Sequence, residues 1–199
     1  MKKFRKVKTC DFVKIRARDG SMLDSDQRAE ELAKHLESIQ WARRPNTIPS
    51  QKPAVFNFLD MNCSNFDVAE LSLILRKLKK RKAAGDDGIP AEFWQVCLER
   101  DILMEWLLNF CNKIWTSEVI PTDWHRAKVA CLFKKGDPAC PDNYRPISLL
   151  QIGYKIFSSM LLYRLKCAGV EQKIWQTQFG FRSGCGTSDA VFICRRLIE

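Results

Sequence analysis

The sequence is poor in the residues that hold metal ions. It has only two histidines, His35 and His125, and no two of its nine cysteines stand at the C-x-x-C spacing of zinc ligands. It therefore predicts no zinc site. Because the cysteines are odd in number and form no regular framework, we expect reduced thiols rather than disulfides.

Long apolar runs are also missing. No window approaches the roughly 18 consecutive apolar residues that a membrane-spanning helix needs. The basic start of the chain, residues 1–8, is not followed by the apolar stretch of a signal peptide. We therefore expect no membrane partner and a location in the cytoplasm, the nucleus or both.

Common catalytic motifs are absent as well. The chain has neither the G-x-S-x-G of many hydrolases nor the G-x-x-x-x-G-K-[ST] of a phosphate-binding loop. Gly85-Asp86-Asp87 spells the signature with which some RNA polymerases hold magnesium at a hairpin tip. Its flanks build no strand and no earlier strand supplies a partner aspartate, so an Asp-Gly turn between two helices is expected. We assign no catalytic and no metal-binding residue.

What the chain does have is an excess of positive charge. It carries 33 lysines and arginines against 23 acidic residues, a net charge of +10, while its 46% of apolar residues is ordinary for a globular protein. Such an excess favours a polyanionic partner, and nucleic acid is the first candidate. Many basic proteins bind no polyanion, so composition alone leaves both readings open.

The hydrophobic pattern predicts an α+β fold that is rich in helices. At the start, a hairpin over residues 12–23 turns at Asp19-Gly20 and feeds a helix over residues 26–41, which Ser25 caps. A proline-rich linker follows over residues 45–53. The next helix starts at Ser64 or Asn65, with Ser64 and Asp67 resembling a capping box.

Further helices and one clear strand are expected downstream. A long helix over residues 101–117 should turn Leu103, Trp106, Leu107, Phe110 and Ile114 inward. Residues 128–133 predict a short buried strand. The remaining predicted helices cover residues 91–99, 152–168 and 187–199.

Cations cluster at three places on these elements. Residues 76–82 hold six cations among seven residues, more than a helix C-terminus needs to balance its dipole, which favours a surface that faces phosphates. Lys134 and Lys135 leave the end of the expected strand, and Arg145 follows a short loop later. Together they could grip a triphosphate, although a solvated turn explains them equally well. Arg182 could stack on a base or contact a phosphate.

Four motifs in series resemble the reverse transcriptases of non-LTR (LINE-type) retrotransposons, in order and in spacing, from about Ser64 to Glu199. The motifs are Lys82-Ala83-Ala84-Gly85-Asp86-Asp87-Gly88-Ile89-Pro90, Phe133-Lys134-Lys135-Gly136-Asp137, Asn143-Tyr144-Arg145-Pro146-Ile147-Ser148-Leu149-Leu150 and Gln178-Phe179-Gly180-Phe181-Arg182. Each is weak alone, but the series is specific. The family usually has proline where Asp86 stands.

The resemblance implies the helix-rich fingers subdomain of a right-hand polymerase, truncated before the catalytic palm. It implies that a lysine, which is Lys134 or Lys135, and Arg145 face the phosphates of the incoming deoxynucleoside triphosphate. It also places two groups of residues along the template path: Lys82, Gly85, Asp87, Gly88 and Ile89, and then Gly180, Phe181 and Arg182. From the density of cations we add Lys79, Lys80 and Arg81 to the template contacts.

The resemblance further implies two domains, partners and a cofactor. Residues 1–63 would form an N-terminal hairpin-helix arm with its linker, and residues 64–199 a partial reverse transcriptase domain. The partners would be an RNA template and a DNA primer, with a palm and thumb region in the full-length protein. Mg²⁺ would serve the complete enzyme through carboxylates that this chain lacks, so we expect no polymerase activity from the chain alone. A non-catalytic nucleic-acid-binding module and an inactive retroelement relic are the alternatives.

Overall fold

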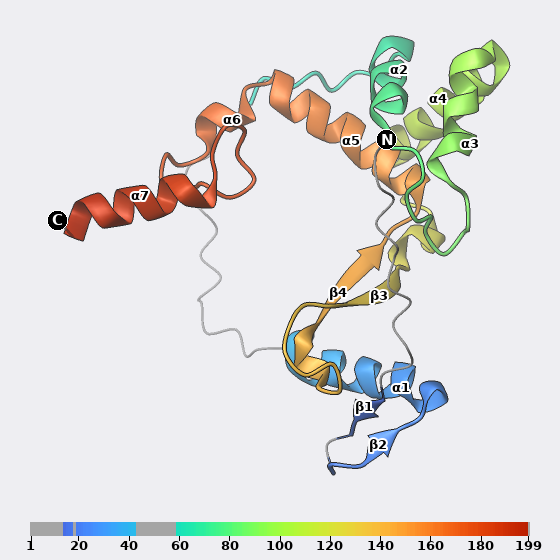
Figure 1. The fold of residues 1–199 in the computed structure, drawn as a ribbon. Coiled ribbons are helices and arrows are strands. Elements are labelled where there is room, and N and C mark those ends of the chain that lie inside the picture. The colour runs from blue at the N-terminus through green and yellow to red at the C-terminus, as the bar shows by residue number, and fades with distance from the viewer. Residues whose placement is uncertain (1–13, 18, 43–58, 199) are drawn as a thin grey trace, which may run out of the picture. The chain divides into compact units, whose positions relative to one another are not determined.

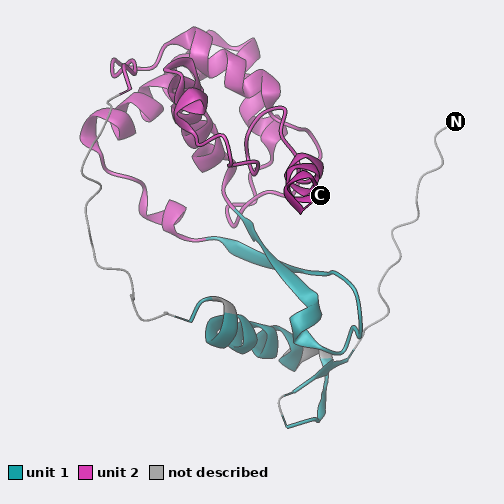
Figure 2. Ribbon diagram, turned by 90° about the vertical axis from the view of Figure 1, so that its left-hand side faces the viewer, with its two compact units in different colours: residues 1–52, 127–149 teal, residues 53–126, 150–199 magenta. Residues whose placement is uncertain are grey.

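The computed structural model describes residues 14–17, 19–42 and 59–198. The chain divides into two compact units, which Figure 2 draws in teal and magenta. Unit 1 comprises residues 1–52 and 127–149, and unit 2 comprises residues 53–126 and 150–199. The structure thus groups residues 127–149 with the N-terminal segment, a grouping that the expected division at residue 63 does not contain. The mixture of helices and strands confirms the α+β class.

Unit 1 combines two antiparallel hairpins with one helix (Figure 1). Gly20, at a φ of +89°, makes the first turn, as the sequence predicts. The helix begins at Ser25, so Asp24 and not Ser25 occupies the N-cap position. The elements are β1 (Ile15–Arg16), β2 (Met22–Leu23), α1 (Ser25–His35), the π-helical turn η1 (Leu36–Gln40), β3 (Lys128–Phe133), the 3₁₀ turn η4 (Pro141–Asn143) and β4 (Tyr144–Leu149).

The core of unit 1 is small. It consists of Ile15 from β1, Leu32 from α1 and Tyr144 from β4, with Cys131 of β3 packed against them. The prediction that β3 is buried is wrong, because four of its six residues are exposed. A ribbon of two strands has two faces, and α1 contacts only one of them.

Unit 2 is a helical assembly. Its elements are α2 (Val68–Lys77), α3 (Ala91–Gln95), η2 (Val96–Glu99), α4 (Asp101–Ser117), η3 (Thr122–His125), α5 (Ile152–Cys167), α6 (Val170–Lys173) and α7 (Thr187–Ile198). Its core is formed mainly by α2, α4 and α5, with Phe66 and Trp94 among the buried side chains. The proline-rich linker at residues 45–53 lies outside the described residues.

Two details of unit 2 differ from the sequence predictions. The capping box at the start of α2 is made by Asp67 and Glu70, and Ser64 lies outside the helix. In α4 the buried face contains Met104, Leu107, Cys111 and Ile114, whereas Leu103 and Trp106 are 40% and 57% exposed. The buried stripe is therefore rotated around the helix axis from the one that we expected from the largest side chains, and it includes the thioether of Met104 and the thiol of Cys111.

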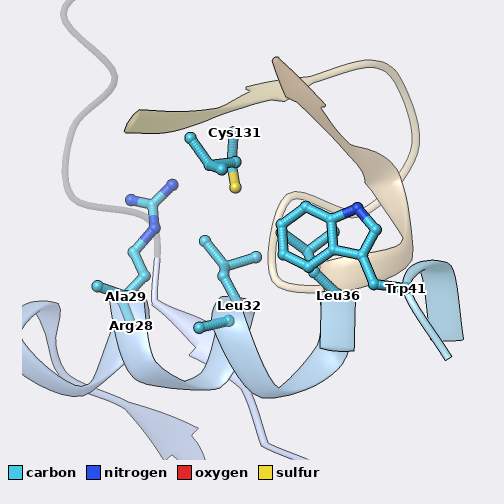
Figure 3. A pocket seen from close by; sticks show the side chains of 8 residues that line it. Arg28, Ala29, Leu32, Leu36, Trp41 and Cys131 are labelled. Carbon is cyan, nitrogen blue, oxygen red and sulfur yellow. The ribbon is translucent and has the colours of Figure 1, made fainter. Parts of the chain in front are cut away.

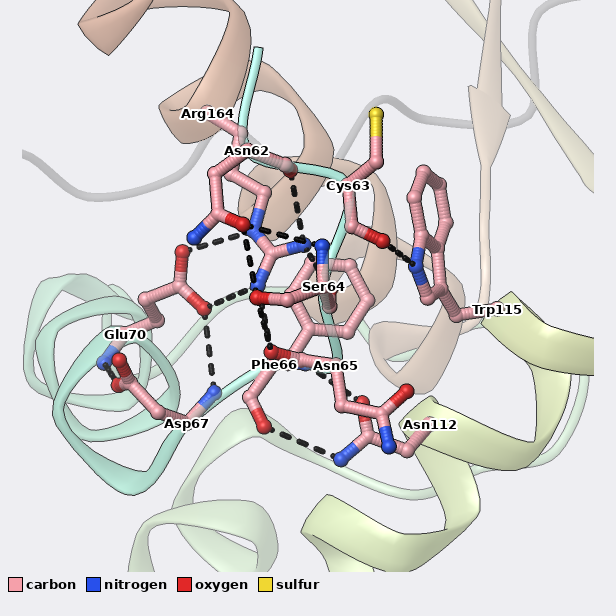
Figure 4. A network of polar contacts seen from close by, with 10 residues as sticks. All are labelled: Asn62, Cys63, Ser64, Asn65, Phe66, Asp67, Glu70, Asn112, Trp115 and Arg164. Carbon is pink, nitrogen blue, oxygen red and sulfur yellow. Dashed lines mark hydrogen bonds and ion pairs between the residues drawn. The ribbon is translucent and has the colours of Figure 1, made fainter.

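Arg164 of α5 holds unit 2 together at its centre (Figure 4). Its side chain is 2% exposed and forms a bidentate ion pair with Glu70, with both nitrogen–oxygen distances at 2.8 Å. The remaining N–H groups donate to three backbone carbonyls, those of Asn62, Ser64 and Asn65. Every guanidinium donor is thus satisfied, which is the condition for burying such a charge without a large penalty.

The same contact fixes the segment that precedes α2. The Arg164 guanidinium lies 4.1 Å from the centroid of the Phe66 ring, and Phe66 exchanges two backbone hydrogen bonds with the Asn112 amide. The Trp115 indole donates to the Cys63 carbonyl at 3.2 Å. Hydrogen bonding from Arg164 also lowers the pKa of Glu70. The segment is therefore tied to α4 and α5 at once.

We expect Arg164→Lys to destabilise the protein by about 3 kcal/mol. A lysine has too few N–H donors to replace the five of the guanidinium, so Glu70 and some of the three carbonyls would lose their hydrogen bonds. Removing one partner of a buried ion pair strongly lowers the free energy of unfolding. Urea unfolding followed by circular dichroism measures the change. Arg100→Lys, on the surface, is the matched control and should stay within about 0.5 kcal/mol. An equally small effect at Arg164 would contradict this account.

Candidate functional site

The β3–β4 hairpin positions the cations that we expect to bind phosphates. Its register pairs Leu132 with Arg145 and Phe133 with Tyr144. The ladder continues one step further, since the Lys134 N–H donates to the Asn143 carbonyl at 2.8 Å. Because side chains alternate between the faces of a strand, Lys134 and Arg145 share one face as diagonal neighbours, with Cβ atoms about 7–8 Å apart.

The opposite face of the hairpin is the one that packs. There the rings of Phe133 and Tyr144 lie 5.6 Å apart, and Tyr144 is buried against α1. Lys135 comes after the ladder, in a bend with Gly136. The register therefore separates the two lysines that the sequence left equivalent: Lys134 is held by the ladder, and Lys135 is on the loop.

The loop between the two strands is built by the uncharged motif residues and one aspartate. Gly136 has a φ of +94°, and a Cβ there would lie 2.8 Å from the Asn143 side-chain nitrogen. That nitrogen donates to the Asp137 carbonyl at 2.9 Å. The Asp137 carboxylate accepts from the Ala139 N–H at 2.9 Å and pairs with Arg16 at 3.6 Å. Gly136, Asp137 and Asn143 are thus explained by the geometry of the loop.

Lys134, Lys135 and Arg145 remain outside this loop framework. All three are exposed, and none of the ion pairs or side-chain hydrogen bonds within the described residues includes them. Charged groups that neither pack nor pair contribute little to folding. The hairpin therefore presents free cations on a rigid support, an arrangement that suits a phosphate ligand.

The basic run of unit 2 lies beyond the end of α2 and is fixed by α3. The Gln95 amide donates to the carbonyls of Leu75 and Leu78 at the helix C-terminus, at 3.2 and 3.1 Å. The Arg81 N–H donates to the Glu92 carboxylate at 2.6 Å, which lowers the pKa of Glu92. Arg81 takes a positive φ of 56° there. Lys79, Lys80, Arg81 and Lys82 are all exposed.

The motif that follows the basic run makes a turn against α5. The Gly88 N–H donates to the Gly85 carbonyl at 3.2 Å, so that Asp86 and Asp87 occupy the centre of the turn that we predicted. Asp87 accepts from the Ile89 N–H at 3.2 Å, and the Ile89 side chain packs against the core. Gly88 takes a φ of +67°. Gly88 and Ile89 therefore shape this turn, whatever else they contact.

The third group lies in the loop between α6 and α7. Gly180 and Phe181 are exposed, and Phe181 combines a full exposure of its ring with a positive φ of 61°. Arg182 is partly buried and donates to the Gln176 carbonyl at 3.5 Å. Unit 2 thus carries the residues expected on the template path, and unit 1 carries those expected at the nucleotide.

The described residues do not fit a magnesium site. Among residues 14–17, 19–42 and 59–198, no group of three or more histidine, cysteine, aspartate or glutamate side chains could hold a metal ion. Asp86 and Asp87 are exposed in their turn. In the same part of the chain, no helix has the length and apolar character to cross a membrane.

Sequence reasoning missed the anchoring residues of these sites. Arg164 stands inside an apolar helical stripe, and its only sequence signal is that position: an arginine in register with Ile156 and Met160. Gln95 and Glu92 look like ordinary surface residues of a helix. Their role depends on which carbonyls and N–H groups the chain brings to them, and no spacing rule contains that information.

Comparison with curated proteins finds polymerases of transposable elements. The chain is 30% identical over 133 residues to the RNA-directed DNA polymerase from mobile element jockey of Drosophila melanogaster, covering 66% of this chain and 14% of that protein. It is 31% identical over 126 residues to the probable RNA-directed DNA polymerase from transposon BS of the same organism, covering 62% and 14%. With the transposon TX1 uncharacterized 149 kDa protein of Xenopus laevis it shares 33% over 130 residues, 65% and 10% of the two chains.

These matches confirm the resemblance to non-LTR retrotransposon polymerases that the four motifs predict. The chain spans about 14% of the length of the first two relatives. No family model matches the chain.

We expect Gly85→Ala to destabilise unit 2 by about 1–3 kcal/mol. An added Cβ would lie 2.6 Å from both the Cα and the N of Gln151, where only backbone could yield, and overpacking of this kind costs that much. Gly180→Ala is the matched control, since its Cβ meets nothing within 4 Å. Thermal unfolding of both variants measures the difference. Equal melting temperatures would show that Gly85 is not in close contact with α5.

Proposed function

From its similarity to non-LTR retrotransposon polymerases, we propose that this chain is the fingers portion of an RNA-directed DNA polymerase. It contributes contacts to the incoming deoxynucleoside triphosphate and to the template strand, and the chemistry of DNA synthesis belongs to the complete enzyme. The observation that supports the proposal is the β3–β4 hairpin, whose register makes Lys134 and Arg145 diagonal neighbours on one face, where both are exposed among the described residues.

The assignment of roles follows from geometry and side-chain chemistry. Arg145 offers a planar fork of donors that can take two oxygens of one phosphate, and Lys134 supplies a point charge beside it. Lys135, on the bend, reaches the same ligand with more freedom. Because Gly136 and Asn143 hold the loop, its backbone needs little reordering when a ligand binds, which lowers the entropic cost of binding.

The template contacts are assigned to unit 2 in the same way. Lys79, Lys80, Arg81 and Lys82 are exposed cations that precede the Gly85–Gly88 turn, with the backbone anchored at Arg81, and Gly180, Phe181 and Arg182 offer an exposed ring beside a cation. An exposed aromatic ring stacks on bases without regard to sequence, while cations follow the backbone. This combination suits single-stranded template RNA.

Nucleotide binding is tested first. We expect Arg145→Gln to weaken binding of a deoxynucleoside triphosphate to the chain by about 10–100-fold, because one charge-assisted, bidentate contact is lost. Isothermal titration calorimetry of the two proteins measures this. Lys173→Gln, which removes one exposed charge from α6, is the control and should bind like the parent. If both variants bind equally well, Arg145 has no role at the nucleotide.

RNA binding is tested by its dependence on salt. Each phosphate neutralised on a single strand adds about 0.7 to the slope of log K against log salt. Replacing Lys79, Lys80 and Lys82 by Gln should therefore reduce that slope by about 2, as measured by fluorescence anisotropy of a labelled RNA.

The control for the RNA experiment has the same loss of charge elsewhere. Replacing Lys113, Lys128 and Lys173, all exposed, by Gln should leave the slope within about 0.7 of the parent value. Equal slopes for the two triple variants would mean that the basic run responds only to net charge. A slope near zero for the parent chain would remove nucleic acid as its partner and favour the inactive relic.

A further inference from the structure

Unit 1 contains a cavity that the proposed function does not use. It has a volume of about 410 Å³ and lies between α1 and β3 (Figure 3). That volume falls in the range of small-molecule sites, about 300–1,000 Å³. The lining residues are Arg28, Ala29, Leu32, Ala33, Leu36, Trp41, Val129 and Cys131.

The shape of the cavity follows from the helix that forms its floor. Arg28, Leu32 and Leu36 recur at intervals of four and so share one face of the helix, over a length of about 12 Å. Figure 3 shows Arg28 at one end and Trp41 at the other, with the Cys131 sulfur pointing in from the strand between them. The cavity is therefore an apolar slot with a cation at one end.

The charge of Arg28 is not balanced by a carboxylate. Its Nη2 donates weakly to the Tyr144 hydroxyl at 3.4 Å, and its guanidinium carbon lies 5.6 Å from the centroid of that ring. Within the described residues, none of the ion pairs includes Arg28. The side chain is partly buried, so water screens its charge less than on an open surface.

The charge of Arg28 also acts on a group inside the slot, the Cys131 thiol. Burial raises the pKa of the Cys131 thiol, and the Arg28 charge opposes that rise. The guanidinium thus acts electrostatically on the group that points into the middle of the cavity. An anion bound in the slot would feel the same attraction.

We propose that this slot binds a small hydrophobic carboxylate, with its apolar body between Leu32, Leu36 and Trp41 and its carboxylate on the Arg28 guanidinium. The guanidinium fork matches the two carboxylate oxygens, and the length of the floor suits an extended alkyl chain. An uncharged apolar side chain from a partner protein fits less well, because it leaves Arg28 unpaired beside apolar walls.

Protection of Cys131 from alkylation tests the proposal. The full chain is treated with N-ethylmaleimide with and without decanoate, and each cysteine is followed by peptide mass spectrometry. We expect decanoate to slow modification of Cys131 about 10-fold and to leave Cys167, which is exposed at the end of α5, unchanged. Decanol, which has the same chain without the charge, should protect at least 10-fold less well at equal concentration.

Two variants decide which part of the slot binds. Arg28→Gln should weaken the protection by decanoate about 10-fold, whereas Arg100→Gln, which removes a surface charge from unit 2, should not change it. Ala33→Leu fills the slot and keeps Arg28, so decanoate should no longer slow the alkylation of Cys131 in this variant. If Arg28→Gln does not fold, Ala33→Leu is the variant that tests binding in the slot. Far-UV circular dichroism checks the fold of each.

Three results would overturn the proposal. Equal protection by decanol and decanoate would remove the role of the charge. Equal slowing at Cys131 and Cys167 would mean a general effect of decanoate on the chain. Protection by an apolar peptide with an amidated C-terminus, in the absence of any effect of decanoate, would assign the slot to a protein partner instead.

Discussion

The buried guanidinium of Arg164 is the contact on which unit 2 depends. Five donors meet five acceptors on Glu70 and on the segment before α2, and the plane of the group lies against Phe66. A charge buried in this way favours one arrangement of the chain strongly, since any shift of that segment leaves donors without partners. Arg164 therefore fixes the start of α2, which is the helix that leads into the basic run.

Unit 1 has a much smaller hydrophobic core than unit 2. Among its described residues the hydrophobic cluster of Ile15, Leu32 and Tyr144 is small, and hydrogen bonds also hold the β3–β4 loop: Asn143 to Asp137, Tyr144 to Pro138, and Arg16 to the Ala139 carbonyl. The motif residues of this hairpin thus divide into two groups, according to whether they hold the loop. Gly136, Asp137 and Asn143 build the loop, and the cations next to them, Lys134, Lys135 and Arg145, are exposed and take no part in it.

Much of the fold follows from local patterns, and the misses have specific causes. The strand over residues 128–133 and the helix over residues 101–117 were predicted to the residue. The cap of α2 was misplaced from Asp67 to Ser64, because Ser64 with Asp67 and Asp67 with Glu70 both have capping-box spacing. The predicted burial of β3 was wrong, and the predicted inward face of α4 was right for Leu107 and Ile114 but wrong for Leu103 and Trp106. Burial depends on which elements pack against a helix or strand, and hydrophobicity alone does not determine that.

For the candidate site, the sequence by itself determined the chemistry: which cations exist, their order along the chain, and the motif series that resembles non-LTR polymerases. Only the tertiary structure decided how these residues are used. The register of β3 and β4 makes Lys134 and Arg145 diagonal neighbours on one face and leaves Lys135 on the bend. Packing also places Gly85 against Gln151 at the start of α5, and Arg28 at one end of the slot in unit 1. Residue type and spacing act locally, whereas these roles arise from groups distant in the chain that packing brings within a few ångströms.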